Sequence, residues 1–284
     1  MNIIDAHFHF SGLKCFREAA QSNGVNYSLQ GFEKEYSENR IISGVCMGLS
    51  EGIPGAFPDQ EALNPMKYDL AELPENFYFC AGVNPHQLSQ SQLANLKQEL
   101  NKPQCVGIKI YAGYYHYYLT DSVYQPVYEL ALKYKLPVVI HTGDTYSPKG
   151  LLKYSHPLIV DELAVCNPEL KILIAHLGNP WLMDTAEILY KNKNVYGDLS
   201  GLQVGDSHLL KRFMNQELYM NMFRTALILA DSYDKLLFGS DWPLAPMSDY
   251  IEFIKQLIPE VHHQAVFYDN ALRFFSKMKI QEKS

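Results

Sequence analysis

A closed (β/α)8 barrel is the fold that this sequence predicts, and three observations lead to it. Short runs rich in β-branched and aromatic residues recur eight times, with their starts about 24 to 40 residues apart. Segments with helical periodicity lie between several of these runs. A chain of 284 residues with 47% hydrophobic content can bury the core that such a barrel needs. Near-continuous apolar strands that alternate with helices are typical of a parallel sheet covered by helices, and eight such units close into a TIM barrel.

The strands and helices of the predicted barrel follow one another along the whole chain. Eight apolar runs suit strands because their β-branched and aromatic side chains pack well on a pleated sheet. They span residues 3–8, 40–49, 77–83, 105–111, 137–143, 171–178, 195–201 and 235–242. Four intervening segments repeat apolar residues at helical spacing. These predicted helices span residues 89–100, 124–134, 157–166 and 218–233.

The long first connection, at about residues 10–39, is polar and contains Gly, Asn and Ser. A connection of this length and composition is typical of a functional insertion, so we expect a loop and a helix over the mouth of the barrel. No linker divides the remainder of the chain. The sequence therefore predicts one TIM-barrel domain over residues 1–284.

Charge and hydropathy limit the class of partner. The net charge of -7 at pH 7 is unsuited to nucleic acid or to an anionic membrane surface. No apolar stretch approaches the ~18 residues that a membrane-spanning helix requires. The first predicted strand begins at Ile3, with no basic and apolar leader before it. We therefore expect a cytoplasmic protein that acts on a small molecule.

Five polar residues close apolar runs of strand length, namely His7, His9, His141, His176 and Asp241. The carboxyl ends of parallel strands meet at one rim of a barrel, so residues distant in sequence can meet there. His7 and His9 are two positions apart on one strand and are expected to point to the same side. Buried imidazoles and a carboxylate are costly alone, whereas a divalent metal ion satisfies them together. The pattern predicts a metal-dependent enzyme.

Several phrases occur in the order found in a known family. They are HLGNPW at 176–181, DLSG at 198–201, FGSDWP at 238–243 and DNALRFF at 269–275. With the HxH of the first strand and the histidines that end the fifth and sixth, this order resembles the amidohydrolase superfamily over the whole chain. The phrases are similar to its amidohydrolase-2 branch, which includes aminocarboxymuconate semialdehyde decarboxylase.

The resemblance implies one divalent metal ion, commonly zinc, with a water molecule completing its shell. Its expected ligands are His7, His9, His141 and Asp241. His176 would orient the water or transfer a proton, so His176 and Asp241 are the predicted catalytic residues. Manganese, iron or cobalt would also suit these ligands. Zinc in such a shell lowers the pKa of bound water towards ~7.

Lys109 ends the fourth strand, where some members of the superfamily carry a carbamylated lysine and others a cation that holds substrate. With one metal implied, we prefer a free ammonium that pairs with a substrate carboxylate over a carbamate or a structural ion pair. Tyr111 and His116, in the tyrosine-rich segment that follows, and His156 are predicted to contact substrate. Packing beneath the adjoining loops is the alternative. Asp198 is a candidate to support a ligand histidine from behind.

Two reactions fit this set of residues. We favour a hydrolase that directs activated water at an ester, lactone, amide or related carbonyl of a small, carboxylated molecule. The alternative is non-oxidative decarboxylation of an aromatic or unsaturated acid. A barrel that binds a metabolite without turnover is a third and less favoured interpretation. Barrels of this kind often dimerise, so a homodimer is left open.

Overall fold

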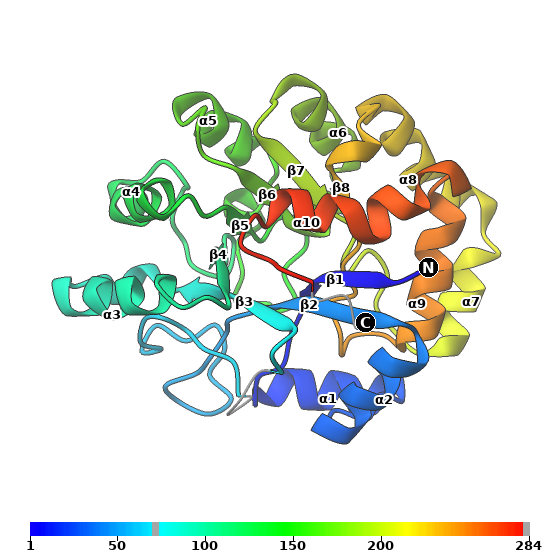
Figure 1. The fold of residues 1–284 in the computed structure, drawn as a ribbon, viewed down its shortest axis with the longest axis horizontal. Coiled ribbons are helices and arrows are strands. Elements are labelled where there is room, and N and C mark those ends of the chain that lie inside the picture. Colours follow the sequence, from blue (N-terminus) through cyan, green and yellow to red (C-terminus); the bar gives the residue numbers. More distant parts are fainter. Residues whose placement is uncertain (70–73, 281–284) are drawn as a thin grey trace.

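The structure is a computed structural model and describes residues 1–69 and 74–280. Eight strands form one sheet in sequence order, and helices surround it (Figure 1). The strands are β1 Ile3–Phe8, β2 Ile41–Met47, β3 Phe77–Val83, β4 Cys105–Ile110, β5 Val138–Ile140, β6 Ile172–Ile174, β7 Val195–Asp198 and β8 Leu236–Leu237. Each strand pairs in parallel with the next. The predicted (β/α)8 TIM barrel is therefore confirmed.

The first and last strands are joined by the backbone that follows β8. The N–H of Ala6 donates to the carbonyl of Phe238 at 2.9 Å, and the N–H of Asp241 donates to the carbonyl of His7 at 2.8 Å. The predicted eighth strand, at 235–242, is longer than β8: the N–H of Phe238 donates to the carbonyl of Val266, and Asp241 adopts a left-handed backbone with φ 58°. A left-handed residue ends regular strand geometry.

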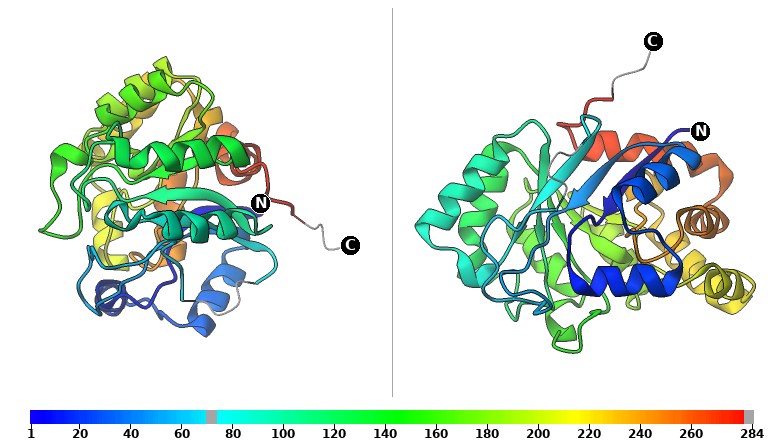
Figure 2. Two further views of the ribbon diagram at one scale, coloured as in Figure 1. Left: turned by 90° about the vertical axis from the view of Figure 1, so that its left-hand side faces the viewer. Right: turned by 90° about the horizontal axis from the view of Figure 1, so that it is seen from below.

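Ten α-helices are described outside the sheet, and Figure 2 shows this ring of helices from two further directions. They are α1 Lys14–Asn23, α2 Leu29–Glu38, α3 Gln90–Leu100, α4 Gln125–Tyr134, α5 Leu158–Cys166, α6 Leu182–Lys191, α7 Ser207–Met214, α8 Glu217–Ala230, α9 Met247–Leu257 and α10 Asn270–Phe274. The four predicted helices correspond to α3, α4, α5 and α8. In the part of the chain that the structure describes, no helix is long and apolar enough to cross a membrane.

The segment predicted as an insertion over the mouth, residues 10–39, contains α1 and α2. The first of these helices reaches the mouth, where Cys15 and Phe16 line a cavity. The second is capped by Ser28, which directly precedes it and whose side chain accepts a hydrogen bond from the N–H of Gly31. It packs against β2 and α9 on the outside of the barrel. Only the first half of the segment therefore contributes to the cavity.

The apolar core has two main parts. One lies between the strands and the surrounding helices. The other, which we call the inner cluster, takes buried residues from seven strands and the C-terminal segment: Ile4, Ala6, Val45, Met47, Tyr78, Cys80, Val106, Val139, Leu173, Ala175, Leu237, Ala271, Phe274, Phe275 and Met278. Because its members come from strands all around the sheet, the inner cluster fills the barrel. Helix α10 supplies Phe274, which is fully buried against Tyr196 of β7.

Candidate active site

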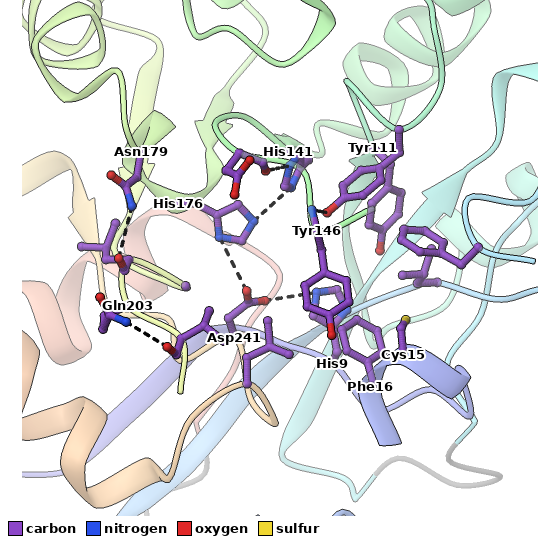
Figure 3. A pocket seen from close by; sticks show the side chains of 18 of the residues that line it. His9, Cys15, Phe16, Tyr111, His141, Tyr146, His176, Asn179, Gln203 and Asp241 are labelled. Atoms are coloured by element: carbon purple, nitrogen blue, oxygen red, sulfur yellow. Dashed lines mark hydrogen bonds and ion pairs between the residues drawn. The ribbon is translucent and has the colours of Figure 1, made fainter. Parts of the chain in front are cut away.

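A cavity of about 330 Å³ lies at the carboxyl ends of the strands (Figure 3). Its walls come from the ends of most strands, from α1 and from α8. The lining residues are His9, Cys15, Phe16, Leu49, Phe57, Lys109, Tyr111, Tyr114, His141, Asp144, Tyr146, His176, Asn179, Gly201, Leu202, Gln203, Val204, Tyr219, Asp241 and Leu244. This is the rim at which (β/α)8 barrels place their chemistry.

Three predicted ligands meet on one side of this cavity. His7, His9 and Asp241 each offer one ligand atom, and these atoms lie within 4.8 Å of one another. Asp241 Oδ1 is 3.2 Å from His9 Nε2 and 3.6 Å from His7 Nε2. Among the described residues, neither Asp241 Oδ1 nor His9 Nδ1 has a hydrogen-bond partner, although both atoms are buried. A buried carboxylate oxygen without a hydrogen-bond partner is costly unless a cation satisfies it, so Asp241 Oδ1, with the Nε2 atoms of His7 and His9 beside it, fits a divalent metal ion.

Asp198 orients His7 from behind. The Nδ1–H of His7 donates to Asp198 Oδ2 at 2.8 Å, which leaves the lone pair of His7 Nε2 facing Asp241. Burial acts to raise the pKa of Asp198, but His7 outweighs it and holds that pKa well below its usual range. Asp198 Oδ1 also accepts the backbone N–H of His176 at 2.9 Å and the hydroxyl of Ser200 at 2.5 Å. The sequence-based role of Asp198 as a support for a ligand histidine matches these contacts.

His176 lies between Asp241 and His141, and in Figure 3 dashed lines join His9, Asp241, His176 and His141 in this order along a bent path. His176 Nδ1 is 3.8 Å from Asp241 Oδ2, and His176 Nε2 is 3.1 Å from His141 Nδ1. Burial lowers the pKa of His176 to about 4, although Asp241 acts in the opposite direction. His176 is therefore a neutral imidazole at pH 7, able to accept and return a proton.

His141 does not join the other three predicted ligands. Its Nδ1 faces His176, and its Nε2–H donates to the carbonyl of Asp144 at 2.9 Å. Both ring nitrogens are thus engaged by the loop after β5 and by its neighbour from β6. Burial holds the pKa of His141 well below its ordinary value, with His176 acting in the same direction. The structure brings three of the four predicted ligands to ligand distance and places the fourth beside the catalytic candidate.

Two site residues have strained backbones. His176 and Asp241 are left-handed, with φ 59° and 58°. This conformation costs a non-glycine residue on the order of 1–2 kcal/mol, and it tends to occur at functional sites. Gly201 makes room for both side chains, because a Cβ at this position would lie 2.6 Å from Asp241 Oδ2 and 2.9 Å from His176 Nδ1. The glycine of the DLSG phrase is therefore required by the packing of the site.

Lys109 is fully buried at the floor of the cavity, with Nζ 3.5 Å from His7 Nε2. Burial lowers its pKa to about 8, with Asp198 and Asp241 acting in the opposite direction. No carboxylate oxygen of the described residues lies within 4.0 Å of Nζ, so the structure does not show the structural ion pair that the sequence left open. Lys109 thus presents a largely unpaired ammonium to the cavity.

The other predicted substrate contacts divide into two kinds. Tyr111 lines the cavity, and its hydroxyl donates to the carbonyl of Gly48 at 2.7 Å. His116 lies outside, with its ring stacked on Tyr154 and its Nε2 3.0 Å from the carbonyl of Lys149. His156 also lies outside and packs against Trp181, 3.9 Å from Asp184. The prediction that His116 and His156 contact substrate is not supported, because neighbours outside the cavity engage both rings.

Other lining residues were not singled out from the sequence. Asn179 lies within the HLGNPW phrase after β6, and Gln203 comes two residues after the DLSG phrase that ends β7; this position after a strand is the signal that could have identified them. Both amides bond within the rim: Asn179 Nδ2 donates to Leu202 O at 3.2 Å, and Gln203 Oε1 accepts the hydroxyl of Tyr219 at 2.6 Å. They shape the wall opposite Tyr111.

The sequence matches the amidohydrolase family over residues 4–277. A search of curated proteins gives no match. One similar solved structure is an uncharacterised TIM-barrel protein from Bordetella bronchiseptica, with 17% identity, a TM-score of 0.71, and coverage of 98% of this chain and 99% of the other.

Two further solved structures have named activities. A probable 2-pyrone-4,6-dicarboxylic acid hydrolase from Acinetobacter baumannii, with citric acid bound, has 18% identity, a TM-score of 0.62, and coverage of 97% of this chain and 100% of the other. A 5-carboxyvanillate decarboxylase from Novosphingobium aromaticivorans, complexed with manganese and 4-hydroxy-3-methoxy-5-nitrobenzoic acid, has 13% identity and a TM-score of 0.63, with coverage of 97% and 96%. At these identities, the likeness shows the fold.

Proposed function

Because this chain belongs to the amidohydrolase family, which contains metal-dependent hydrolases and decarboxylases, we propose that it is a metal-dependent hydrolase. Its substrate would be a small, carboxylated molecule with an ester, lactone, amide or related carbonyl. The observation that carries this proposal is the position of Asp241. This carboxylate lies within 4 Å of His7, His9 and His176, and one of its oxygens has no hydrogen-bond partner among the described residues.

The proposed metal ligands are His7, His9 and Asp241. His141, the fourth ligand predicted from the sequence, has both ring nitrogens engaged by Asp144 and His176 and is left out of this set. Imidazole and carboxylate ligands suit zinc first and also accept manganese, iron or cobalt. When bound, such an ion lowers the pKa of water towards ~7 and polarises a carbonyl group.

The residues of the chain supply the remaining functions. Lys109 pairs with the substrate carboxylate at the floor of the cavity, since no described carboxylate neutralises its charge. Asp241 accepts the proton that the attacking water loses. His176, which is neutral and 3.8 Å from Asp241 Oδ2, then transfers this proton to the leaving oxygen or nitrogen. The imidazole of His176 therefore ends the cycle in its starting state.

Decarboxylation of an aromatic or unsaturated acid is the second candidate, and one observation favours it. Phe16, Tyr111 and Tyr114 place aromatic rings along the cavity, and Lys109 Nζ is 5.4 Å from the ring centre of Tyr111. A planar acid would pack between such rings. In this reaction His176 would polarise the substrate, and the substrate would lose carbon dioxide without attack by water.

One experiment separates these reactions. The purified protein is analysed for metal and then incubated with lactones, esters and aromatic carboxylic acids in water labelled with ¹⁸O. Hydrolysis places one ¹⁸O in the product acid and releases no carbon dioxide. Carbon dioxide release without label in the organic product would replace the hydrolase by the decarboxylase. Tight ligand binding with no turnover of either class would contradict both and support a binding protein.

A further inference from the structure

Two tyrosine hydroxyls of the same loop are used differently in the cavity. The hydroxyl of Tyr111 donates its proton to the carbonyl of Gly48 at 2.7 Å. The hydroxyl of Tyr114 instead accepts the backbone N–H of Tyr146 at 2.9 Å. Within residues 1–69 and 74–280, no hydrogen bond donated by Tyr114 is found. Tyr114 is only 8% exposed and lines the cavity. Its unused O–H is therefore a donor that a molecule in the cavity can use.

The surrounding packing holds this donor in place. The ring of Tyr114 packs 4.7 Å from the ring of His141 and 4.9 Å from that of Phe57, measured between centroids. Gly113, with φ 87°, turns the backbone directly before it, and a Cβ there would lie 2.7 Å from Ser155 Cβ. The carbonyl of Gly113 also accepts the N–H of Leu151 at 2.9 Å. A donor fixed in this way can discriminate between ligands with little loss of entropy on binding.

The cavity also has an uneven distribution of charge. Lys109 is the one lysine or arginine among the described lining residues, and it lies at the floor, next to His7. The rim carries Asp144, which is exposed and adds negative charge. One substrate carboxylate can therefore pair with a cation at the floor. A second carboxylate, higher in the cavity, would meet aromatic rings, amides and the Tyr114 hydroxyl but no second cation. One neutral donor offsets only part of the desolvation cost of a charged group.

We propose that Tyr114 is a specificity-determining residue, whose hydroxyl donates a hydrogen bond to a neutral oxygen of a substrate that carries a single carboxylate. The proposal rests on the proposed function in one respect, because it places the substrate carboxylate at Lys109. Carbonyl, ether and phenolic oxygens are acceptors of the required kind. Dicarboxylates are disfavoured by the same arrangement.

Ligand binding tests this role without turnover. The probes are 3- and 4-acetylbenzoate, each compared by calorimetry with the isopropenylbenzoate of the same substitution, which has a similar shape but no acceptor oxygen. Wild-type protein is expected to bind at least one acetyl probe about three- to tenfold more tightly than its partner, the effect of one hydrogen bond. Tyr114→Phe should abolish this preference.

Tyr111→Phe is the matched control, because it removes a hydroxyl from the same loop that is already bonded to Gly48. This variant should keep the preference for the acetyl probe. A preference that survives Tyr114→Phe, or equal binding of both probes by wild-type protein, overturns the proposal. Equal weakening of both probes in Tyr114→Phe also overturns it, since this result would show a structural role in holding the Tyr146 loop.

A separate binding measurement tests the expected preference for a single carboxylate. Benzene-1,3-dicarboxylate is expected to bind about tenfold or more weakly than 3-acetylbenzoate, because its second charge lacks a partner. Equal or tighter binding of the dicarboxylate contradicts the inference. These affinities are independent of catalysis, so failure to turn over any hydrolase or decarboxylase substrate would overturn the proposed function and leave the result for Tyr114 standing.

Discussion

The inner cluster and the rim lie on the same strands but meet different physical demands. On β5, Val139 belongs to the inner cluster, whereas His141, two residues later, lines the cavity. Likewise, Leu237 of β8 belongs to the inner cluster, and Asp241, further along the chain, lines the cavity. Each of these strands contributes first to stability and then to chemistry as it rises through the barrel. Substitutions in the inner cluster should therefore mainly lower stability, and substitutions at the rim should mainly lower activity.

The two regions also differ in how their atoms are satisfied. The inner cluster is apolar and is covered at one end by α10. The rim buries imidazoles, carboxylates and an ammonium, and among the described residues Asp241 Oδ1 and His9 Nδ1 have no hydrogen-bond partner. It also contains the left-handed residues His176 and Asp241. Unsatisfied atoms and strain lower stability, which indicates that the rim is arranged for binding and chemistry.

The largest effect is expected for Asp241→Asn. An amide cannot accept the proton of the attacking water and is a poor metal ligand, so kcat/KM should fall on the order of 10⁴-fold, and bound metal should fall with it. Steady-state kinetics and metal analysis measure the two losses. Asp231→Asn is the control, since Asp231 is an exposed aspartate with a left-handed backbone, φ 43°, at the end of α8. Full activity of Asp241→Asn would disprove its assigned role.

Phe274→Ala tests the other region. Removing this fully buried ring from the inner cluster leaves a cavity and should lower the free energy of unfolding by about 3–5 kcal/mol. Activity per folded molecule should stay within about threefold of wild type. Denaturant unfolding and kinetics at low temperature measure these quantities. The control is Leu218→Ala, which alters a side chain that is 90% exposed and should change neither quantity. If Phe274→Ala lost as much kcat/KM as Asp241→Asn, the two regions would not be separable.

Lys109→Met replaces the buried ammonium of the rim by an apolar side chain of the kind that fills the inner cluster. The KM for a carboxylated substrate should rise about 10- to 100-fold, because a charge-assisted hydrogen bond is lost. The thermal unfolding temperature should rise as well, since a buried ammonium without a carboxylate partner is removed. The methyl ester of the same substrate provides the control, because its KM should not change. A KM that rises equally for acid and ester would show that Lys109 does not recognise the carboxylate.

Ser200→Ala should give the smallest effect. The Ser200 hydroxyl donates to Asp198 Oδ1 at 2.5 Å and lies 3.1 Å from His7 Nδ1 and 3.0 Å from His176 Nδ1. Its loss removes about one hydrogen bond from the support of these rings, so kcat/KM should fall about 3- to 10-fold with little change in KM. Ser207→Ala, at the first residue of α7, is the control. A drop as large as that of Asp241→Asn would indicate a direct part in the reaction.

The sequence predicted the order of the strands and four of the helices because hydrophobic periodicity is local. It extended β5, β6, β7 and β8 too far, since apolar patterning does not reveal where the backbone leaves sheet geometry. After β6, for example, His176 and Leu177 adopt left-handed backbone. For the site, His7, His9 and Asp241 were predicted correctly as neighbours. His116 and His156, expected to contact substrate, are not among the residues that line the cavity. Their rings pack on Tyr154 and Trp181, and these contacts form only when the loops fold.

By itself, the sequence determined which chemical groups follow each strand, and barrel geometry then places those groups at one rim. Only the tertiary structure decided which of their atoms are free. The Nδ1 of His7 is engaged by Asp198, and the hydroxyl of Tyr111 by Gly48, whereas the proton of Tyr114 has no acceptor in the described chain. The physical reason is that a hydrogen bond depends on distance and angle between segments far apart in sequence, while residue type and spacing record only what each segment can offer.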